Sequence, residues 1–185
     1  NKNDILDRVF KTGVYKSDGV SKTLSPSMDI QVASNFERLL FDLLNNDTKE
    51  VRKLMNNLSN KGHFNLEKKI LTRISKDFDS AAVTDDDTIA TINHFYNERE
   101  IVLCPHSAIG VRVAKDFIDT GETVVSLGTA HPAKFKETVE SALELSIPIP
   151  PALAAIMEKQ ESVRVIPPNK HKVAEEIRKS FLEEN

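Results

Sequence analysis

Residues 124–143, VVSLGTAHPAKFKETVESAL, gather a hydroxyl, an imidazole and an amine where an apolar run gives way to a helical pattern. Thr129 can donate or accept a hydrogen bond, and His131 and Lys134 can carry positive charge. The strand end of an α/β unit is a common place for a ligand, and Gly128 lets the backbone approach it closely. The alternative is an ordinary strand-to-helix turn in which Thr129 or His131 caps the helix.

A second group of reactive side chains lies in LCPHSAIG, where Cys104 ends an apolar run and His106 follows two residues later. A thiol beside an imidazole could act as a nucleophile with its base, as in a cysteine-dependent hydrolase. A metal site built from Cys104, His106 and His131 would need all three to converge without a closely spaced ligand pair. A free cysteine usually packs as a small hydrophobic residue, so we favour a buried thiol and no metal.

Two further ligand signals are weak. The six glycines are scattered and form neither of the glycine-rich motifs that cradle nucleotide phosphates. The acidic run TDDD at residues 84–87 lacks the alternating oxygen ligands of a calcium loop. Acidic residues in the first turn of a helix interact favourably with its dipole, so this run is interpreted as a helix start.

The composition fits one ordinary domain, because the chain has 185 residues of which 39% are hydrophobic. A formal net charge of −3 gives no basic field for nucleic acid or an anionic membrane, which leaves small molecules and proteins as expected partners. The one cysteine excludes an internal disulfide framework, and no long apolar run predicts a membrane span. We therefore expect a cytoplasmic location.

The first half of the chain predicts helices. Asn3 or Asp4 can cap a short helix that Gly13 ends. Four amphipathic helices then follow, with apolar residues three and four positions apart. They are expected to start near Ser34, Asp47, Asn65 and Thr84, with capping boxes at Ser34–Glu37, Asp47–Glu50 and Thr84–Asp87.

Short apolar, β-branched runs at 101–104 and 123–127 predict two strands of a parallel sheet, and 162–166 predicts a poorer third. Such strands need neighbours on both sides, so the sheet is incomplete. The expected fold class is α/β, with a helix-rich part at 1–99 and an α/β part at 100–185. The missing strands either escape these patterns or belong to polypeptide outside this chain, which does not begin with methionine.

Long motifs carry a family resemblance. TLSPSMDIQVASNFERLLFDL (23–43) and VSLGTAHPAKFKETVE (125–140), with NKNDIL (1–6) and CPHSAIGV (104–111), resemble the threonine synthases of the fungal and bacterial type. The resemblance implies the C-terminal portion of a fold type II pyridoxal 5'-phosphate enzyme. Members of that family convert O-phospho-L-homoserine and water to L-threonine and phosphate.

The resemblance also implies what this segment lacks. The lysine that forms a Schiff base with the cofactor, and the loop that holds the cofactor phosphate, belong upstream of Asn1. The expected partner is therefore the upstream part of the same enzyme, and the segment alone is expected to be inactive. The alternative is a stand-alone, non-catalytic α/β binding or interaction module.

Roles for individual residues follow from the same motifs. Thr129, next to Gly128, is expected to meet the pyridine nitrogen of the cofactor. His131 and Lys134 are expected to orient the loop or the substrate phosphate, and Lys134 is not the Schiff-base lysine. In the N-terminal motif, Asn3 and Asp4 are either substrate contacts or a helix cap.

Overall fold

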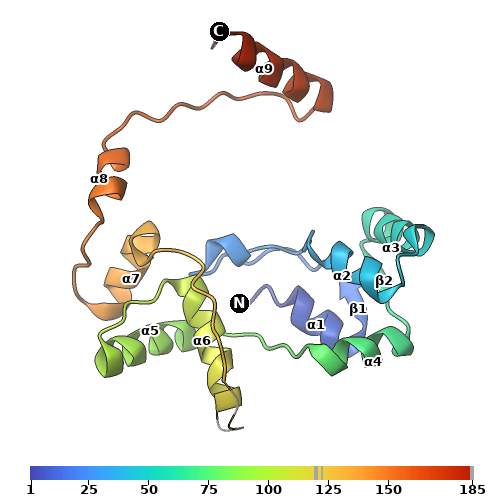
Figure 1. Cartoon of the computed structure of the whole chain (residues 1–185), viewed down its shortest axis with the longest axis horizontal. Helices are drawn as coiled ribbons and strands as arrows, with labels where there is room; N and C mark the ends of the chain where they lie inside the picture. The colour runs from blue at the N-terminus through green and yellow to red at the C-terminus, as the bar shows by residue number, and fades with distance from the viewer. Residues whose placement is uncertain (119–120, 122, 184–185) are drawn as a thin grey trace. The chain divides into compact units, whose positions relative to one another are not determined.

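The computed structural model describes residues 1–118, 121 and 123–183, and it divides the chain into two compact units, Asn1–Pro148 and Ile149–Asn185 (Figure 1). The first unit contains α1 (Ile5–Thr12), β1 (Val14–Lys16), the 3-10 turn η1 (Pro26–Met28), α2 (Phe36–Leu43), α3 (Thr48–Lys61), β2 (His63–Asn65), α4 (Lys68–Asp77), α5 (Asp85–Arg99), α6 (Pro105–Ile118), the 3-10 turn η2 (Pro132–Phe135) and α7 (Lys136–Leu143). The second unit contains α8 (Pro151–Met157) and α9 (Lys170–Glu183).

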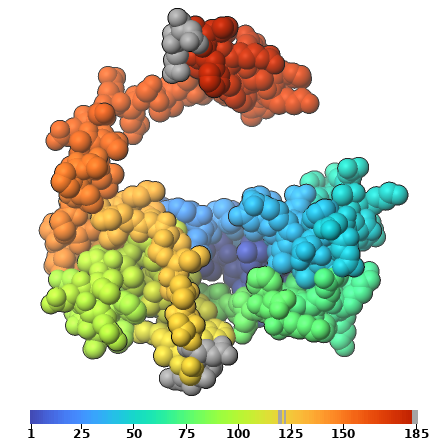
Figure 2. Space-filling model, in the orientation of Figure 1, coloured from blue at the N-terminus to red at the C-terminus, as the bar shows by residue number. Residues whose placement is uncertain are grey.

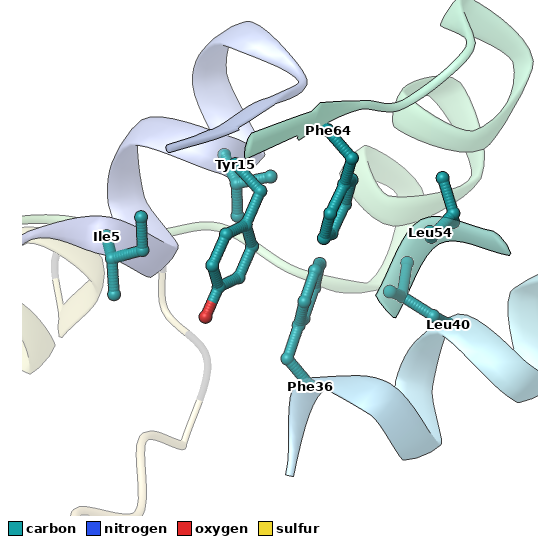
Figure 3. Packing of buried hydrophobic residues seen from close by; sticks show 7 residues of the cluster. Ile5, Tyr15, Phe36, Leu40, Leu54 and Phe64 are labelled. Atoms are coloured by element: carbon teal, nitrogen blue, oxygen red, sulfur yellow. The ribbon is translucent and has the colours of Figure 1, made fainter. Parts of the chain in front are cut away.

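The two short strands β1 and β2 pair antiparallel and organise one hydrophobic core. Tyr15 lies opposite Phe64, and their rings stack with centroids 4.9 Å apart. Tyr15 also stacks on Phe36 of α2, at 5.6 Å (Figure 3). Because alternate strand residues share one face, these central residues turn inward while their neighbours stay exposed. The rest of this core is aliphatic: Ile5, Val9, Leu40 and Leu54.

The apolar spacing correctly predicts α2, whose Phe36, Leu40 and Leu43 are buried. The predicted capping box at Ser34 is wrong. The helix begins after Asn35, whose side chain makes no capping hydrogen bond. Backbone carbonyls take that role instead, because the N–H of Phe36 donates to the carbonyl of Ala33 at 3.0 Å.

Other helix ends follow their sequence signals. The Asp47 carboxylate accepts from the backbone N–H groups of the first turn of α3, and the Thr84 hydroxyl accepts from the N–H of Asp87. Gly13 ends α1 in the left-handed conformation, with φ 76°. The prediction that Asn65 starts a helix is wrong, because Asn65 belongs to β2 and α4 begins at Lys68.

A second group of helices positions the predicted ligand loop. Helix α5 packs against both α6 and α7. Within this group Thr88, Thr91 and Ile92 of α5, His106 to Ile109 of α6 and Val139 of α7 are buried. Helix α6 and the segment at 123–129 lie close together at Gly110, where an added Cβ would come 3.1 Å from Ser126 Oγ.

The predicted strands at 101–104, 123–127 and 162–166 are not strands among the described residues, whose one sheet is the antiparallel β1–β2 pair. A strand requires a neighbouring strand to pair with its backbone N–H and C=O groups, and in the described part of the chain the only such pairing is that of β1 with β2. Val125 and Leu127 are each 77% exposed, and Val165 is 92% exposed. Figure 2 shows the segment at 123–130, in gold, lying on the surface of the first unit.

Two further observations concern the helices and the charged side chains of the described residues. None of the helices in the described part of the chain has both the length and the apolar character that crossing a bilayer requires. Across the same residues, no three His, Cys, Asp or Glu side chains come together in a way that would hold a metal ion.

Candidate cofactor site

Thr129 belongs to a hydroxyl–thiol cluster, which we define as Cys104, Ser107 and Thr129. Ser107 is in the first turn of α6, and its Oγ lies 3.1 Å from Thr129 Oγ1 and 3.2 Å from Cys104 Sγ. The backbone N–H of Thr129 donates to Ser107 Oγ at 3.0 Å. Cys104 Sγ is 3.7 Å from Thr129 Oγ1 and accepts from the N–H of Ser107 at 3.4 Å. The strand-end and helix-start motifs predicted separately from the sequence are therefore brought together.

The cluster changes the acidity of its thiol. Burial by itself would raise the pKa of Cys104, but hydrogen bonds from Ser107 and Thr129 favour the thiolate and leave the pKa below its ordinary value. The side chain is buried, so the thiol has no open path to a substrate. This geometry favours a packing and hydrogen-bonding role over nucleophilic catalysis.

The His106 ring is directed away from that thiol. Its Nε2 accepts a hydrogen bond from the backbone N–H of Ser27 in η1 at 3.0 Å, and the ring lies against Phe135 with centroids 4.4 Å apart. Burial lowers the pKa of His106, opposed by the charge of Asp29 and assisted by that of Lys134. A histidine held in this way joins η1 to α6 and is not arranged as a base for Cys104.

His131 caps the turn that leads into α7. Its Nδ1 accepts from the N–H of Ala133 at 3.1 Å, and Pro132 takes the first position of η2. His131 therefore caps η2, whereas α7 itself begins after Phe135, whose side chain makes no capping hydrogen bond. The side chains of His131 and Lys134 are both exposed, beside the exposed Thr129.

The N-terminal motif forms a buried polar network around Asp29. Asn3 Nδ2 donates to the carbonyl of Ser21 at 2.8 Å and to Asp29 Oδ1 at 2.9 Å, and Ser21 N–H donates back to Asn3 Oδ1 at 2.8 Å. Asp29 Oδ1 also accepts from Asn1 Nδ2 at 2.9 Å and from the Thr23 hydroxyl at 2.6 Å. The network fixes residues 21–29, and with them η1, beside His106. Sequence patterns gave no signal for Asp29.

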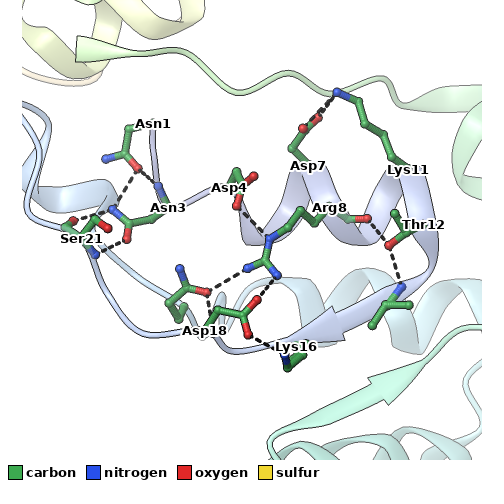
Figure 4. Close-up of polar contacts among 12 residues, drawn as sticks. Asn1, Asn3, Asp4, Asp7, Arg8, Lys11, Thr12, Lys16, Asp18 and Ser21 are labelled. Carbon is green, nitrogen blue, oxygen red and sulfur yellow. Dashed lines mark hydrogen bonds and ion pairs between the residues drawn. The ribbon is translucent and has the colours of Figure 1, made fainter.

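Asp4 makes a different kind of contact. Its carboxylate pairs with Arg8 at 2.8 Å, and Arg8 also reaches Asp18 at 2.7 Å (Figure 4). Asp4 precedes α1 but makes no side-chain capping hydrogen bond. In this structure Asn3 supports a loop and Asp4 stabilises the first turns of α1 through an ion pair.

A largely apolar groove of about 650 Å³ lies between η1, α6 and the segment at 124–129. Its lining includes Thr129, His106, Ser27, Met28, Ile109 and Leu127. An added Cβ at Gly128 would meet nothing within 4 Å, so space is open beside Thr129. The hydroxyl of Thr129 and this open space fit one edge of an aromatic ring that carries a hydrogen-bonding nitrogen. A cavity of similar size between α2 and α3 contains none of the predicted site residues.

Comparisons with known proteins agree on one family. The family model "Threonine synthase, C-terminal" matches residues 107–177. The chain is 44% identical over 169 residues to the threonine synthase of Pseudomonas aeruginosa, covering 90% of this chain and 36% of that protein. It is 43% identical to the threonine synthase of Saccharomyces cerevisiae, covering 77% of this chain and 31% of that protein.

Solved structures give the same answer. A crystal structure of pyridoxal-phosphate-bound threonine synthase from Brucella melitensis matches 97% of this chain and 39% of its own, with 40% identity and a TM-score of 0.80. The threonine synthase from yeast matches 99% of this chain and 41% of its own, with 34% identity and a TM-score of 0.81.

The fold is thus similar to one part of larger enzymes, and the solved structures it resembles include a pyridoxal-phosphate-bound form. The chain belongs to the threonine synthase family, and it corresponds to the C-terminal part of its members. It spans 36% of the length of the P. aeruginosa relative.

Proposed function

We propose that this chain forms one side of the cofactor site of a threonine synthase, which converts O-phospho-L-homoserine and water to L-threonine and phosphate. The main observation behind this proposal is the position of Thr129. It lines an open groove, and its hydroxyl already contacts the buried Ser107. Similarity over 90% of the chain to a threonine synthase supports the assignment.

Pyridoxal phosphate, when bound, supplies an electron sink for bonds broken next to the substrate's amino-bearing carbon. Thr129 would hold its ring nitrogen through a neutral hydroxyl, and Gly128 would leave room for the ring. A hydroxyl can bond to that nitrogen without forcing it to be protonated, as a carboxylate would. His131 and Lys134, exposed beside Thr129, would orient the loop or attract the substrate phosphate.

The apolar segments at 101–104 and 123–127, of which the second is exposed along its whole length, support a further part of the proposal. Val125 and Leu127 are exposed although their residue types are typical of buried strands. We assign both segments to a parallel sheet of fold type II that upstream polypeptide completes, with residues 1–185 acting as one C-terminal segment. The chain by itself would lack the covalent and phosphate anchors of the cofactor and would be inactive.

Substitution of Thr129 in the intact enzyme tests the assignment. Thr129→Val keeps the side-chain volume but removes the hydroxyl, so kcat/KM should fall about tenfold, the value of roughly one hydrogen bond. Thr123→Val, on the same exposed segment but outside the cluster, is the matched control and should keep wild-type turnover. Unchanged turnover in Thr129→Val would remove Thr129 from the site.

Measurements on the isolated chain test whether it binds the cofactor and forms threonine without the upstream polypeptide. Equilibrium dialysis should show weak binding of pyridoxal phosphate to residues 1–185, and threonine formation should be absent. Tight stoichiometric binding by this chain alone would contradict the proposal and favour a stand-alone binding module.

A further inference from the structure

Ser107 is the centre of the hydroxyl–thiol cluster. It contacts Thr129 twice, through the backbone N–H at 3.0 Å and through Oγ1 at 3.1 Å, and it contacts Cys104 Sγ at 3.2 Å. Ser107 is buried in the first turn of α6, whereas Thr129 lies in an exposed segment without regular structure. The rigid partner in this contact is therefore Ser107, and the residue that needs to be positioned is Thr129.

We propose that Ser107, supported by Cys104, is a positioning residue that directs the hydroxyl hydrogen of Thr129 outward, toward the ring nitrogen of the bound cofactor. The proposal rests on the proposed function and deepens it, because it explains how one hydroxyl of an exposed segment keeps a defined direction.

Counting donors and acceptors leads to this arrangement. The Ser107 hydroxyl has one hydrogen and two lone pairs. One lone pair accepts from the N–H of Thr129, and the second can accept from the thiol of Cys104. The Ser107 hydrogen is then free to donate to Thr129 Oγ1, which leaves the hydrogen of Thr129 for an external acceptor. Every group in the chain from thiol to serine to threonine is then satisfied, and successive hydrogen bonds polarise one another.

The opposite direction of donation has a different consequence. If Cys104 were a thiolate it could only accept, so the hydroxyls of Ser107 and Thr129 would both turn toward sulfur. Thr129 would then present only lone pairs to the groove and would bind a protonated ring nitrogen. The state of a buried thiol thus selects which form of the nitrogen Thr129 can bind.

The first measurement is made on the intact enzyme loaded with pyridoxal phosphate labelled with ¹⁵N in the ring. Ser107→Ala should move the ¹⁵N resonance in the same direction as Thr129→Val and lower kcat about threefold to tenfold with little change in KM. Ser141→Ala, exposed on α7, is the matched control and should leave both unchanged. Because Ser107→Ala also removes the acceptor for the backbone N–H of Thr129, Cys104→Ala, which keeps that acceptor, isolates the contribution of the hydroxyl direction.

The second measurement uses the 185-residue chain without cofactor, where Cys104 is the sole sulfhydryl. In Ser107→Ala the thiol loses its acceptor, so the infrared S–H stretching band should move to higher frequency. Cys104→Ala serves as a second variant if Ser107→Ala does not fold, and in the intact enzyme it should shift the ¹⁵N resonance in the same direction but by less.

The outcomes separate the two proposals. A ¹⁵N resonance that moves in Thr129→Val but stays at its wild-type position in Ser107→Ala or in Cys104→Ala overturns the positioning role and leaves the proposed function intact. A resonance that stays unchanged in Thr129→Val overturns both. An S–H band that does not respond to Ser107→Ala also overturns the positioning role, because the thiol would then not donate to Ser107.

Discussion

His106 Nε2 accepts a hydrogen bond from the backbone N–H of Ser27, 79 residues earlier in the chain, at 3.0 Å. The neutral ring therefore carries its hydrogen on Nδ1, which is buried and has no hydrogen-bond partner among the described residues. Protonation of Nε2 would remove the acceptor for Ser27 and place a charge between η1 and α6. The contact is consequently available only to the neutral ring.

This contact predicts a pH dependence of stability. Burial, assisted by Lys134 and opposed by Asp29, lowers the pKa of His106 below its ordinary value of 6.5. As the pH falls below 6.5, the unfolded chain binds a proton that the folded chain does not, so the free energy of unfolding decreases until the folded pKa is passed. His106→Gln keeps an acceptor for Ser27 without titrating, so urea unfolding should show a flatter pH profile between about pH 7.5 and 5.

His63→Gln, on an exposed position of β2, controls for the loss of a histidine as such. Flattening of the same size in both variants would contradict the role given to His106.

The polar network around Asp29 predicts a large effect from one carboxylate. Asp29 accepts hydrogen bonds from the side chains of Asn1, Asn3 and Thr23 and from the N–H of Thr23. Burial would raise the pKa of Asp29, but the hydrogen bonds from Thr23 and Asn1 leave it below 3.8. Asp29→Ala would leave buried donors without an acceptor, so the free energy of unfolding should fall by about 2–3 kcal/mol in urea titrations at neutral pH.

Asp18→Ala is the matched control, because Asp18 forms exposed ion pairs and should cost less than about 1 kcal/mol. The contribution of Asp29 is present above pH 3.8 and is lost as the pH falls through its lower, folded pKa. Equal losses in the two variants would show that the network does not stabilise the fold.

Local patterns predict the parts of this chain that local physics determines. The period of apolar residues finds α2 and its buried Leu40, and cap residues find the starts of α3 and α5. The strands β1 and β2 are each three residues long, which is too short for a clear alternation of apolar and polar side chains. The runs at 101–104 and 123–127 show that a segment is apolar but not which polypeptide covers it.

The candidate site likewise contains residues that the sequence indicates and residues that it does not. Thr129 stands out because it follows an apolar run and precedes a helix start, and the resemblance to threonine synthases gives it a role. Ser107 and Asp29 act through partners 22 and 26 residues away, Thr129 and Asn3. Such pairings are created by tertiary packing, so no spacing in the sequence could indicate them.

Two glycines offer a matched test of packing around a left-handed turn. Gly13 and Gly62 end α1 and α3 with φ values of 76° and 74°. An added Cβ at Gly13 would come 2.9 Å from Leu71 Cδ1 and 3.3 Å from the carbonyl oxygen of Leu66, whereas at Gly62 it would meet nothing within 4 Å. Gly62→Ala should cost about 1–2 kcal/mol from the backbone alone. Gly13→Ala should cost at least about 1 kcal/mol more in the same denaturation assay, because it adds a clash. Equal costs would mean that Leu71 moves aside freely.

The hydroxyl of Tyr15 predicts a loss of stability that aromatic packing alone would not produce. It accepts from the backbone N–H of Ala33 at 2.8 Å, which ties the segment before α2 to the β1–β2 sheet. Tyr15→Phe keeps the stacking on Phe36 and Phe64 but leaves that N–H without its acceptor, so unfolding should become easier by about 1–3 kcal/mol. Tyr96→Phe removes the hydroxyl of the other of the chain's 2 tyrosines and should change stability by less than about 0.5 kcal/mol. Hydrogen exchange at the amide of Ala33 should accelerate in Tyr15→Phe and stay unchanged in Tyr96→Phe; if it is equally slow in both, another group protects that amide and the hydroxyl does not anchor the segment.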